Sequence, residues 1–166
     1  IIYVNPAFTA MTGYAPDEVL GHNCRFLQGP DTNPTARQEI HDAIVEQRPC
    51  KVEILNYRKD GTAFWNELSI TPVRDDAGQT THFIGIQSDV TRRRSAEDSL
   101  RQANDQLKRD LQAAAMVQQA QLPRTLPRAD GVAFGWRFHP CSELAGDTLN
   151  IQRVDAQQVA VYVLDV

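Results

Sequence analysis

Features that would place this chain in a specialised class are scarce or absent. The 166 residues contain three cysteines without a CxxC spacing, which argues against a disulfide framework and a zinc site. No apolar run approaches the roughly 20 residues that a membrane-spanning helix needs. No charged stretch precedes an apolar one at the start, so no signal peptide is indicated. We therefore expect a reducing, cytoplasmic location and no membrane partner.

Basic charge is not in surplus either. Lys and Arg number 17 against 21 Asp and Glu, giving a formal net charge of −4, so the chain lacks the basic footprint of a nucleic-acid-binding protein. The short run Arg92–Arg94 is expected to be a solvated patch. The 42% of hydrophobic residues is enough for one core of ordinary domain size.

Three regions differ in their pattern. Residues 1–91 mix short helices with alternating strands, residues 92–122 are polar and helix-forming without Gly or Pro, and residues 123–166 follow a Pro-bearing junction with strand-like segments. We interpret them as a sensor domain, a helical connector and a truncated effector domain. The sensor is not expected to be an enzyme.

The first region has an α+β pattern. Asn33 and Pro34 form a good helix start. Arg58–Gly61 is a strong hairpin signal. The expected helices cover residues 7–12, 16–20 and 34–47, and the expected strands cover residues 1–4, 51–57, 62–73 and 81–90.

Each strand of the meander places one carboxamide on an otherwise apolar face. These are Asn56, Asn66 and Gln87, because alternate residues of a strand share a face. Buried amides need hydrogen-bond partners. They can satisfy one another, or they can share a flat heterocyclic ligand whose edge alternates donors and acceptors, for which Gly85 would leave space.

The segment Gly21–Gln28, with sequence GHNCRFLQ, resembles the signature of the LOV (light, oxygen, voltage) subclass of PAS domains. The similarity extends from Ile1 through Thr91. Supporting segments are NPAF (5–8), TGY (12–14), QGPDT (28–32), LNY (55–57), FWN (64–66) and FIGIQ (83–87). The resemblance implies a PAS/LOV fold with a five-stranded antiparallel sheet, one strand of which would precede Ile1 and is missing here.

The resemblance also implies a cofactor and a photochemical residue. FMN is expected to bind noncovalently in the dark, and blue light is expected to join the Cys24 sulfur reversibly to flavin carbon C4a. Cys50 and Cys141 are expected to have no such role. The implied flavin contacts are Asn23, Arg25 and Gln28 at the ribityl and phosphate end, Asn56 and Asn66 at the pyrimidine edge, Gln87 near N5 and O4, and apolar walls from Ile54, Leu68, Ile70 and Phe83.

One phosphate-binding position departs from the family pattern. His41 stands where the family usually has a second arginine, and Arg37 lies one helical turn earlier. Arg37 is a candidate substitute. A phosphate-free flavin remains the alternative to FMN.

The resemblance implies that Gln87 passes the light signal from the flavin to the connector. An amide can exchange its NH₂ and C=O groups when flavin N5 changes from acceptor to donor, and the connector starts a few residues later. Leu100, Leu107, Leu111, Ala114 and Leu122 follow steps of mostly three and four residues, a pattern typical of a coiled coil. A parallel homodimer is predicted, with a monomeric spacer as the alternative.

The last region predicts a hairpin with Asp147 and Asp165 nearly opposite each other. Paired carboxylates favour Mg²⁺ or Mn²⁺. The segment resembles the start of the PPM family of metal-dependent serine/threonine phosphatases, although Asn150 departs from the usual Asp. This implies a phosphoprotein substrate for the complete effector and an incomplete active site here. An ordinary hairpin with surface aspartates is the alternative.

Two functional hypotheses follow for the whole chain. The first is a blue-light photoreceptor that regulates a phosphatase. The second is a non-photochemical PAS module for flavin redox sensing or dimerisation. Reversible bleaching of a yellow protein by blue light distinguishes them.

Overall fold

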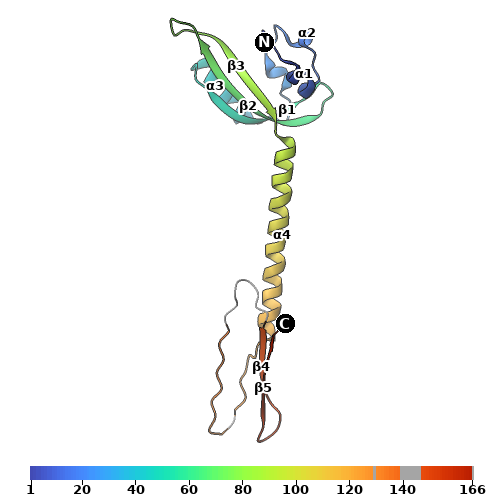
Figure 1. Cartoon of the computed structure of the whole chain (residues 1–166), viewed down its shortest axis with the longest axis vertical. Coiled ribbons are helices and arrows are strands. Elements are labelled where there is room, and N and C mark those ends of the chain that lie inside the picture. The colour runs from blue at the N-terminus through green and yellow to red at the C-terminus, as the bar shows by residue number, and fades with distance from the viewer. Residues whose placement is uncertain (129, 139–146, 166) are drawn as a thin grey trace. The chain divides into compact units, whose positions relative to one another are not determined.

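The computed structural model describes residues 1–128, 130–138 and 147–165. The chain divides into two compact units, Ile1–Glu97 and Asp98–Val166, which are treated separately below (Figure 1). The first unit holds short helices and a sheet, as the sequence predicts. The second holds most of a long helix and a hairpin.

Four short helices come first in the chain: α1 (Pro6–Thr12), α2 (Pro16–Val19), the 3₁₀ helix η1 (Cys24–Leu27) and α3 (Pro34–Val45). The Asn5 carboxamide caps α1 by accepting from the Phe8 N–H at 3.0 Å. Gly13 ends α1 with φ 78°, a left-handed conformation that glycine adopts without strain. Only η1 was not predicted.

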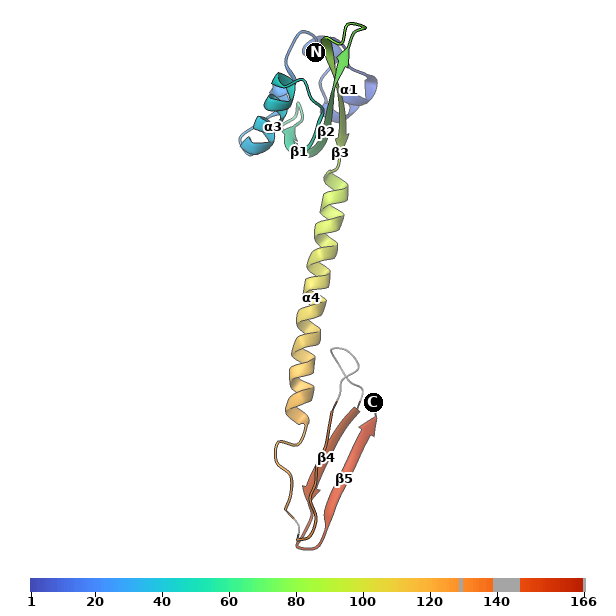
Figure 2. The ribbon, with the colours of Figure 1, turned by 90° about the vertical axis from the view of Figure 1, so that its left-hand side faces the viewer.

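Helix α3 begins where the sequence predicts. Asn33 accepts from the Thr35 N–H at 2.8 Å, and Pro34 occupies the first turn. The helix packs against β1 (Figure 2). The core beneath it consists of Ala43, Cys50, Leu68 and Ile70, so Cys50 is an ordinary buried side chain.

The sheet has three antiparallel strands in the order β1-β2-β3. Their bounds are β1 Cys50–Tyr57, β2 Ala63–Arg74 and β3 Thr80–Asp89. Gly61 (φ 85°) and Gly78 (φ 79°) lie in the two turns, and the first is the turn that Arg58–Gly61 predicts. The register pairs Ile54 with Asn66 and Leu68 with Gln87, so the predicted alternation of faces is confirmed.

The expected five-stranded sheet is wrong for the residues that the structure describes. Residues 1–4 form no strand. The Ile1 amino group instead donates to the His22 carbonyl at 2.7 Å, and the Ile1 carbonyl accepts from the Gly21 N–H at 2.8 Å. Because these backbone groups bind the loop after α2, they are not available to a neighbouring strand.

The connector is one continuous helix, α4 (Thr91–Gln121), of 31 residues. None of these residues, all of which the structure describes, is buried. Leu100 is 71% exposed and Leu107 57%, so its apolar stripe has no partner within the described chain. Among the described helices, none is long and apolar enough to cross a membrane.

The second unit ends in an antiparallel hairpin of β4 (Asp147–Arg153) and β5 (Val159–Asp165). The Asp155 carboxylate accepts from the N–H groups of Gln157 and Gln158 at 2.7 and 2.8 Å, which closes the predicted turn. The register pairs Asp147 directly with Asp165. Cys141 lies outside the described residues.

Candidate functional site

Three carboxamides meet on the inner face of the sheet, and we call them the amide cluster: Asn56, Asn66 and Gln87. The Asn66 Nδ2 group donates to Asn56 Oδ1 at 2.8 Å and to Gln87 Oε1 at 3.0 Å. Asn56 is 4% and Asn66 1% exposed. The predicted convergence of the three side chains is therefore confirmed.

Hydrogen bonds within the amide cluster pair only some of its donors and acceptors. Asn66 Oδ1 is buried and has no hydrogen-bond partner among the described residues, although buried acceptors are normally paired. Asn56 Nδ2 reaches only the carbonyl of the preceding Leu55, at 3.2 Å. An acceptor without a donor, beside two further amides, fits the pyrimidine edge of a flavin, which offers an N–H between two carbonyls.

The surroundings of the amide cluster fit a flat ring. A Cβ built on Gly85 would meet only Leu68, at 3.8 Å, so the backbone of β3 leaves room above the sheet. Phe83, which is predicted to line the flavin ring, is only partly covered, with 36% of its surface exposed. The buried apolar side chains on this face are Ile54, Phe64, Leu68 and Ile70.

Cys24 begins the turn η1. The Asn23 carboxamide caps this turn by accepting from the Arg25 N–H at 3.0 Å. Leu27 is buried with Phe8 and Val19, which anchors the turn, while Cys24 itself is exposed. No hydrogen bond joins Cys24 to the amide cluster within the described residues.

The loop after η1 is held against β1 by residues that the sequence reasoning missed. A Cβ on Gly29 would overlap the Tyr57 ring, so any other residue there would force the ring to move. The Tyr57 hydroxyl donates to Asp31 at 2.9 Å, and Thr32 Oγ1 donates to the Leu55 carbonyl at 2.7 Å. Desolvation and the hydrogen bond to Asp31 raise the pKa of Tyr57.

The predicted phosphate-end residues lie at the surface. Arg25, Arg37 and His41 are exposed and Gln28 is half-buried. No side-chain hydrogen bond or ion pair engages either guanidinium in the part of the chain described. Their exposure is consistent with binding of an anionic ligand.

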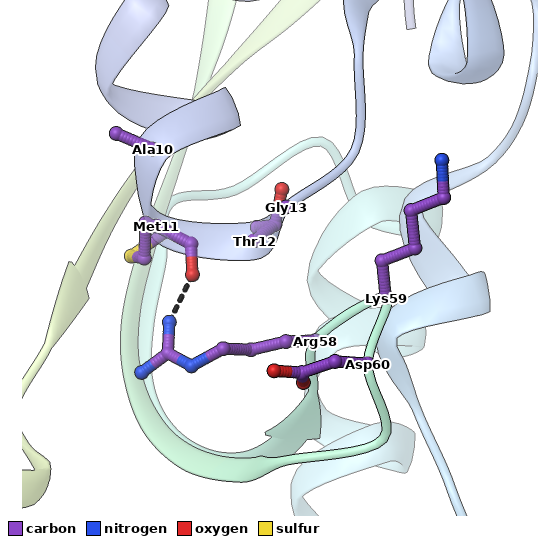
Figure 3. Close-up of a pocket in the computed structure, with 7 residues that line it drawn as sticks. All are labelled: Ala10, Met11, Thr12, Gly13, Arg58, Lys59 and Asp60. Carbon is purple, nitrogen blue, oxygen red and sulfur yellow. Dashed lines mark hydrogen bonds between the residues drawn. The ribbon is translucent and has the colours of Figure 1, made fainter.

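Arg58 joins α1 to the end of β3. Its guanidinium donates to the Met11 carbonyl (Figure 3) and to the Asp89 carboxylate, and it lies 4.4 Å from the centre of the Phe64 ring. A cavity of about 370 Å³ opens beside it. The cavity is lined by Ala10, Met11, Thr12, Gly13, Arg58, Lys59 and Asp60, none of which is a predicted flavin residue.

Asp89 is the last residue of β3 and lies at the start of α4. It accepts from the Thr91 N–H at 2.9 Å. Burial opposes its ionisation, but the hydrogen bonds from Thr91 and Arg58 leave the pKa of Asp89 below its ordinary value. The ionised carboxylate is therefore the form that caps the helix.

The start of α4 is attached to the outer face of the sheet. The Val90 N–H donates to the Trp65 carbonyl, and the Trp65 N–H donates to Thr91 Oγ1, both at 2.9 Å. Arg93 and Arg94 each donate to the Glu53 carboxylate at 2.7 Å. The expectation of a solvated arginine patch is therefore wrong for these two residues, because two acidic strand residues lie within their reach.

The candidate metal ligands are placed only by their backbone. Asp147 and Asp165 are register partners in the hairpin. Among the described residues, no group of three or more His, Cys, Asp or Glu could hold a metal ion. The metal prediction therefore stays a prediction.

The first unit is thus an α+β fold with a partly unsatisfied amide cluster on the inner face of its sheet. The chain belongs to the PAS domain family, whose pattern it matches over residues 1–92. It is 52% identical over 92 residues to Phototropin-2 of Oryza sativa and 50% identical over 91 residues to a blue-light-activated histidine kinase of Brucella canis. It is also 46% identical over 110 residues to the Bacterioopsin transcriptional activator of Halobacterium salinarum.

Solved LOV structures also match this chain. The light-state LOV structure of the blue-light photoreceptor Aureochrome1 matches with a TM-score of 0.56 and 41% identity, over 62% of this chain and 80% of that one. The LOV domain of a blue-light-activated histidine kinase from Erythrobacter litoralis matches with a TM-score of 0.53 and 46% identity, over 54% and 83%. Both solved structures are LOV structures, one of a blue-light photoreceptor and one of a blue-light-activated histidine kinase.

The similarity concerns a small part of each curated relative. Those matches cover 55 to 64% of this chain. The chain spans only 10 to 19% of the length of these proteins.

Proposed function

We propose that residues 1–92 bind FMN and sense blue light through Cys24. The observation that carries this proposal is the unpaired Asn66 Oδ1 in the amide cluster, in a chain that also contains the GHNCRFLQ segment. Asn56 and Asn66 hold the pyrimidine edge, and Gln87 faces N5 and O4. Ile54, Leu68, Ile70 and Phe83 enclose the ring.

We assign binding of the FMN phosphate and ribityl chain to side chains near the surface. Arg25 pairs with the phosphate, since a planar guanidinium suits that anion. Asn23 and Gln28 bind the ribityl chain. Arg37 takes the position of the second arginine one turn from His41, and its unpaired guanidinium is consistent with that role.

If FMN is bound, it would supply a ring that blue light excites, and Cys24 would supply a thiol able to add to that ring reversibly. The thiol would contribute both its sulfur and its proton, so the addition would need no external oxidant. Exposure of Cys24 leaves its sulfur free of the packing role that a buried free cysteine normally has.

The test is an absorption spectrum before and after blue light for the wild type and Cys24→Ala. We expect a yellow protein whose blue absorption band bleaches and recovers, and a Cys24→Ala variant that keeps the colour without bleaching. Cys50→Ala is the matched control and should bleach normally, because Cys50 is buried under α3. A colourless wild type, or bleaching that survives Cys24→Ala, contradicts the proposal and favours a non-photochemical PAS module.

We further propose that α4 carries the signal to an effector as a homodimer. Its exposed leucines support a second copy as partner. The effector proposal is a metal-dependent serine/threonine phosphatase that uses Mg²⁺ or Mn²⁺ and acts on a phosphoprotein. It is supported by the pairing of Asp147 with Asp165.

A further inference from the structure

Thr32 lies in the loop between η1 and α3 and bonds to β1 beside Asn56. Its Oγ1 donates to the Leu55 carbonyl at 2.7 Å, and the Asn56 Nδ2 group donates to the same carbonyl at 3.2 Å. We propose that Thr32 is a positioning residue, whose hydroxyl occupies the Leu55 carbonyl and leaves the Asn56 carboxamide free to turn to a flavin edge. The role toward flavin rests on the proposed function. The control of the Asn56 amide by Thr32 does not.

The surroundings of the Thr32 hydroxyl fix its direction. The side chain is 4% exposed, and Oγ1 accepts from the Gly29 N–H at 2.9 Å. The Gly29 carbonyl in turn accepts from the Thr32 N–H at 3.2 Å. Because a hydroxyl has one proton, and the Gly29 N–H takes a lone pair of the oxygen, that proton is available to the Leu55 carbonyl.

A second contact holds the same loop to β1 on the other side of Asn56. The Tyr57 hydroxyl donates to Asp31 Oδ2 at 2.9 Å and accepts from the Asp31 N–H at 3.4 Å. The Tyr57 ring lies against Gly29, which has no side chain to obstruct it. Since Leu55 and Tyr57 flank Asn56 in the chain, the loop is attached to β1 on both sides of a proposed flavin contact.

The Leu55 carbonyl depends on these donors because β1 is an edge strand of its sheet. Its register partner Trp65 uses its own backbone groups on Val90 and Thr91, beyond β3. In an antiparallel ladder such a pair exchanges no backbone hydrogen bonds, so Leu55 finds its partners at the free edge. When Asn56 turns to a ligand, the Thr32 hydroxyl is the donor that stays.

Four substitutions separate this role from simple support of the loop. Thr32→Val removes the hydroxyl and keeps the shape of the side chain, whereas Thr32→Ser keeps the hydroxyl. Thr35→Val is the matched control, because Thr35 is exposed in the first turn of α3 and its hydroxyl makes no hydrogen bond among the described residues. Tyr57→Phe loosens the loop without removing the donor to Leu55.

The first measurement is the dissociation constant of FMN for the full chain freed of flavin, followed by quenching of flavin fluorescence. Thr32→Val should weaken binding on the order of fivefold, because Asn56 must leave a carbonyl that has lost its other donor. Thr32→Ser should restore most of the affinity, and Thr35→Val should bind as the wild type does. Equal affinity of Thr32→Val and wild type overturns the proposal, as does an equal loss in Thr32→Ser.

The second measurement is the proton resonance of the Asn56 side-chain amide in the flavin-free chain. Thr32→Val should shift one of these resonances downfield, since the bond from Asn56 to the Leu55 carbonyl strengthens when Thr32 no longer shares it. Tyr57→Phe should speed hydrogen exchange at the Gly29 N–H and leave the Asn56 resonance in place. A purely structural role of Thr32 would lower the melting temperature without moving this resonance.

The outcomes keep the two proposals apart. A wild type that binds no FMN contradicts the flavin proposal, while the Asn56 resonance still decides whether Thr32 controls that amide. An unmoved resonance in Thr32→Val overturns the role of Thr32, whatever the wild type binds.

Discussion

At the scale of single residues, Asn66 has the most demanding environment in the sheet. Its two N–H groups go to Asn56 and Gln87, which leaves its buried oxygen without a donor. A buried unpaired acceptor costs about 1–3 kcal/mol. A ligand N–H that reached Oδ1 would remove that cost. The unpaired oxygen would therefore favour binding of the N–H-bearing edge of the proposed flavin.

Asp89 links stability to pH. Its folded-state pKa lies below the ordinary aspartate value, although burial opposes the ionised form, because Thr91 and Arg58 donate to it. A depressed pKa means that the stabilisation is complete above the unfolded-state pKa, about 3.9, and is lost as the pH falls through the lower folded-state value. Asp89→Asn should therefore melt at a lower temperature than the wild type at neutral pH.

The difference between wild type and Asp89→Asn should shrink on acidification below about pH 4. Thermal unfolding followed by circular dichroism from neutral pH downward measures it. Asp76→Asn is the control, because Asp76 is an exposed turn residue whose carboxylate has no partner among the described residues. A melting difference that stayed constant through the acidic range would show that Asp89 acts by shape and not by charge.

At the scale of elements, the apolar stripe of α4 specifies how a second copy would pack. With Leu100 and Leu107 at heptad position d, Asn104 falls at position a. In a parallel, in-register pair each Asn104 faces its own copy and the amides hydrogen-bond, a known device for fixing register. An antiparallel pair would place Asn104 against a leucine. It would also bring the position-e cations Arg101 and Lys108 close to the same cations of the partner helix.

We therefore expect a parallel dimer whose uniformity depends on Asn104. Asn104→Leu should raise the stability of the assembly and broaden its oligomeric state, because the polar layer that selects one register is lost. Sedimentation equilibrium measures both effects. Gln102→Leu, at position f on the opposite side of the helix, should leave the wild-type dimer unchanged. A wild type that stays monomeric contradicts the pairing.

Local signals in the sequence predicted most elements. Asn33 and Gly61 act on their own segments, so a helix cap and a hairpin turn can be recognised from neighbouring residues. Strand alternation then placed the amide cluster on one face. These are short-range rules, and they held because each depends on fewer than about ten residues of chain.

The features that the sequence did not predict depend on distant partners. Ile1 uses its backbone groups on the loop at Gly21 and His22, so a strand-like segment forms no strand. From the sequence Arg94 looks like a solvated charge, because its partners Glu53 and Trp65 lie far earlier in the chain. Side-chain pairing across such separations is not encoded in any local pattern.

At the scale of the whole molecule, the two faces of the sheet carry different groups one residue apart in the chain. The inner face carries the amide cluster, and the outer face carries Glu53 and Trp65, which contact Arg94 near the start of α4. Asn66 therefore lies beside a residue that binds the connector, since the Trp65 N–H donates to Thr91 Oγ1. We expect a change in hydrogen bonding at the amides to reach the connector through β2 and β3.

This arrangement predicts how a chain that carries the proposed phosphatase effector would respond to light. With Mn²⁺ present, hydrolysis of a phosphopeptide by such a chain should differ between dark and blue-light samples. Gln87→Leu should still bleach but lose that difference, because leucine cannot exchange a donor for an acceptor at flavin N5. Gln79→Leu, in the turn before β3, is the control.

The possible outcomes separate the parts of the proposal. No hydrolysis in either state contradicts the phosphatase, and hydrolysis without a light difference contradicts coupling through α4. A light difference that survives in Gln87→Leu removes Gln87 from the route. Asn66 would then be the next candidate, because it hydrogen-bonds Gln87 and lies between Trp65 and Glu67 in the chain, and the signal would leave through β2.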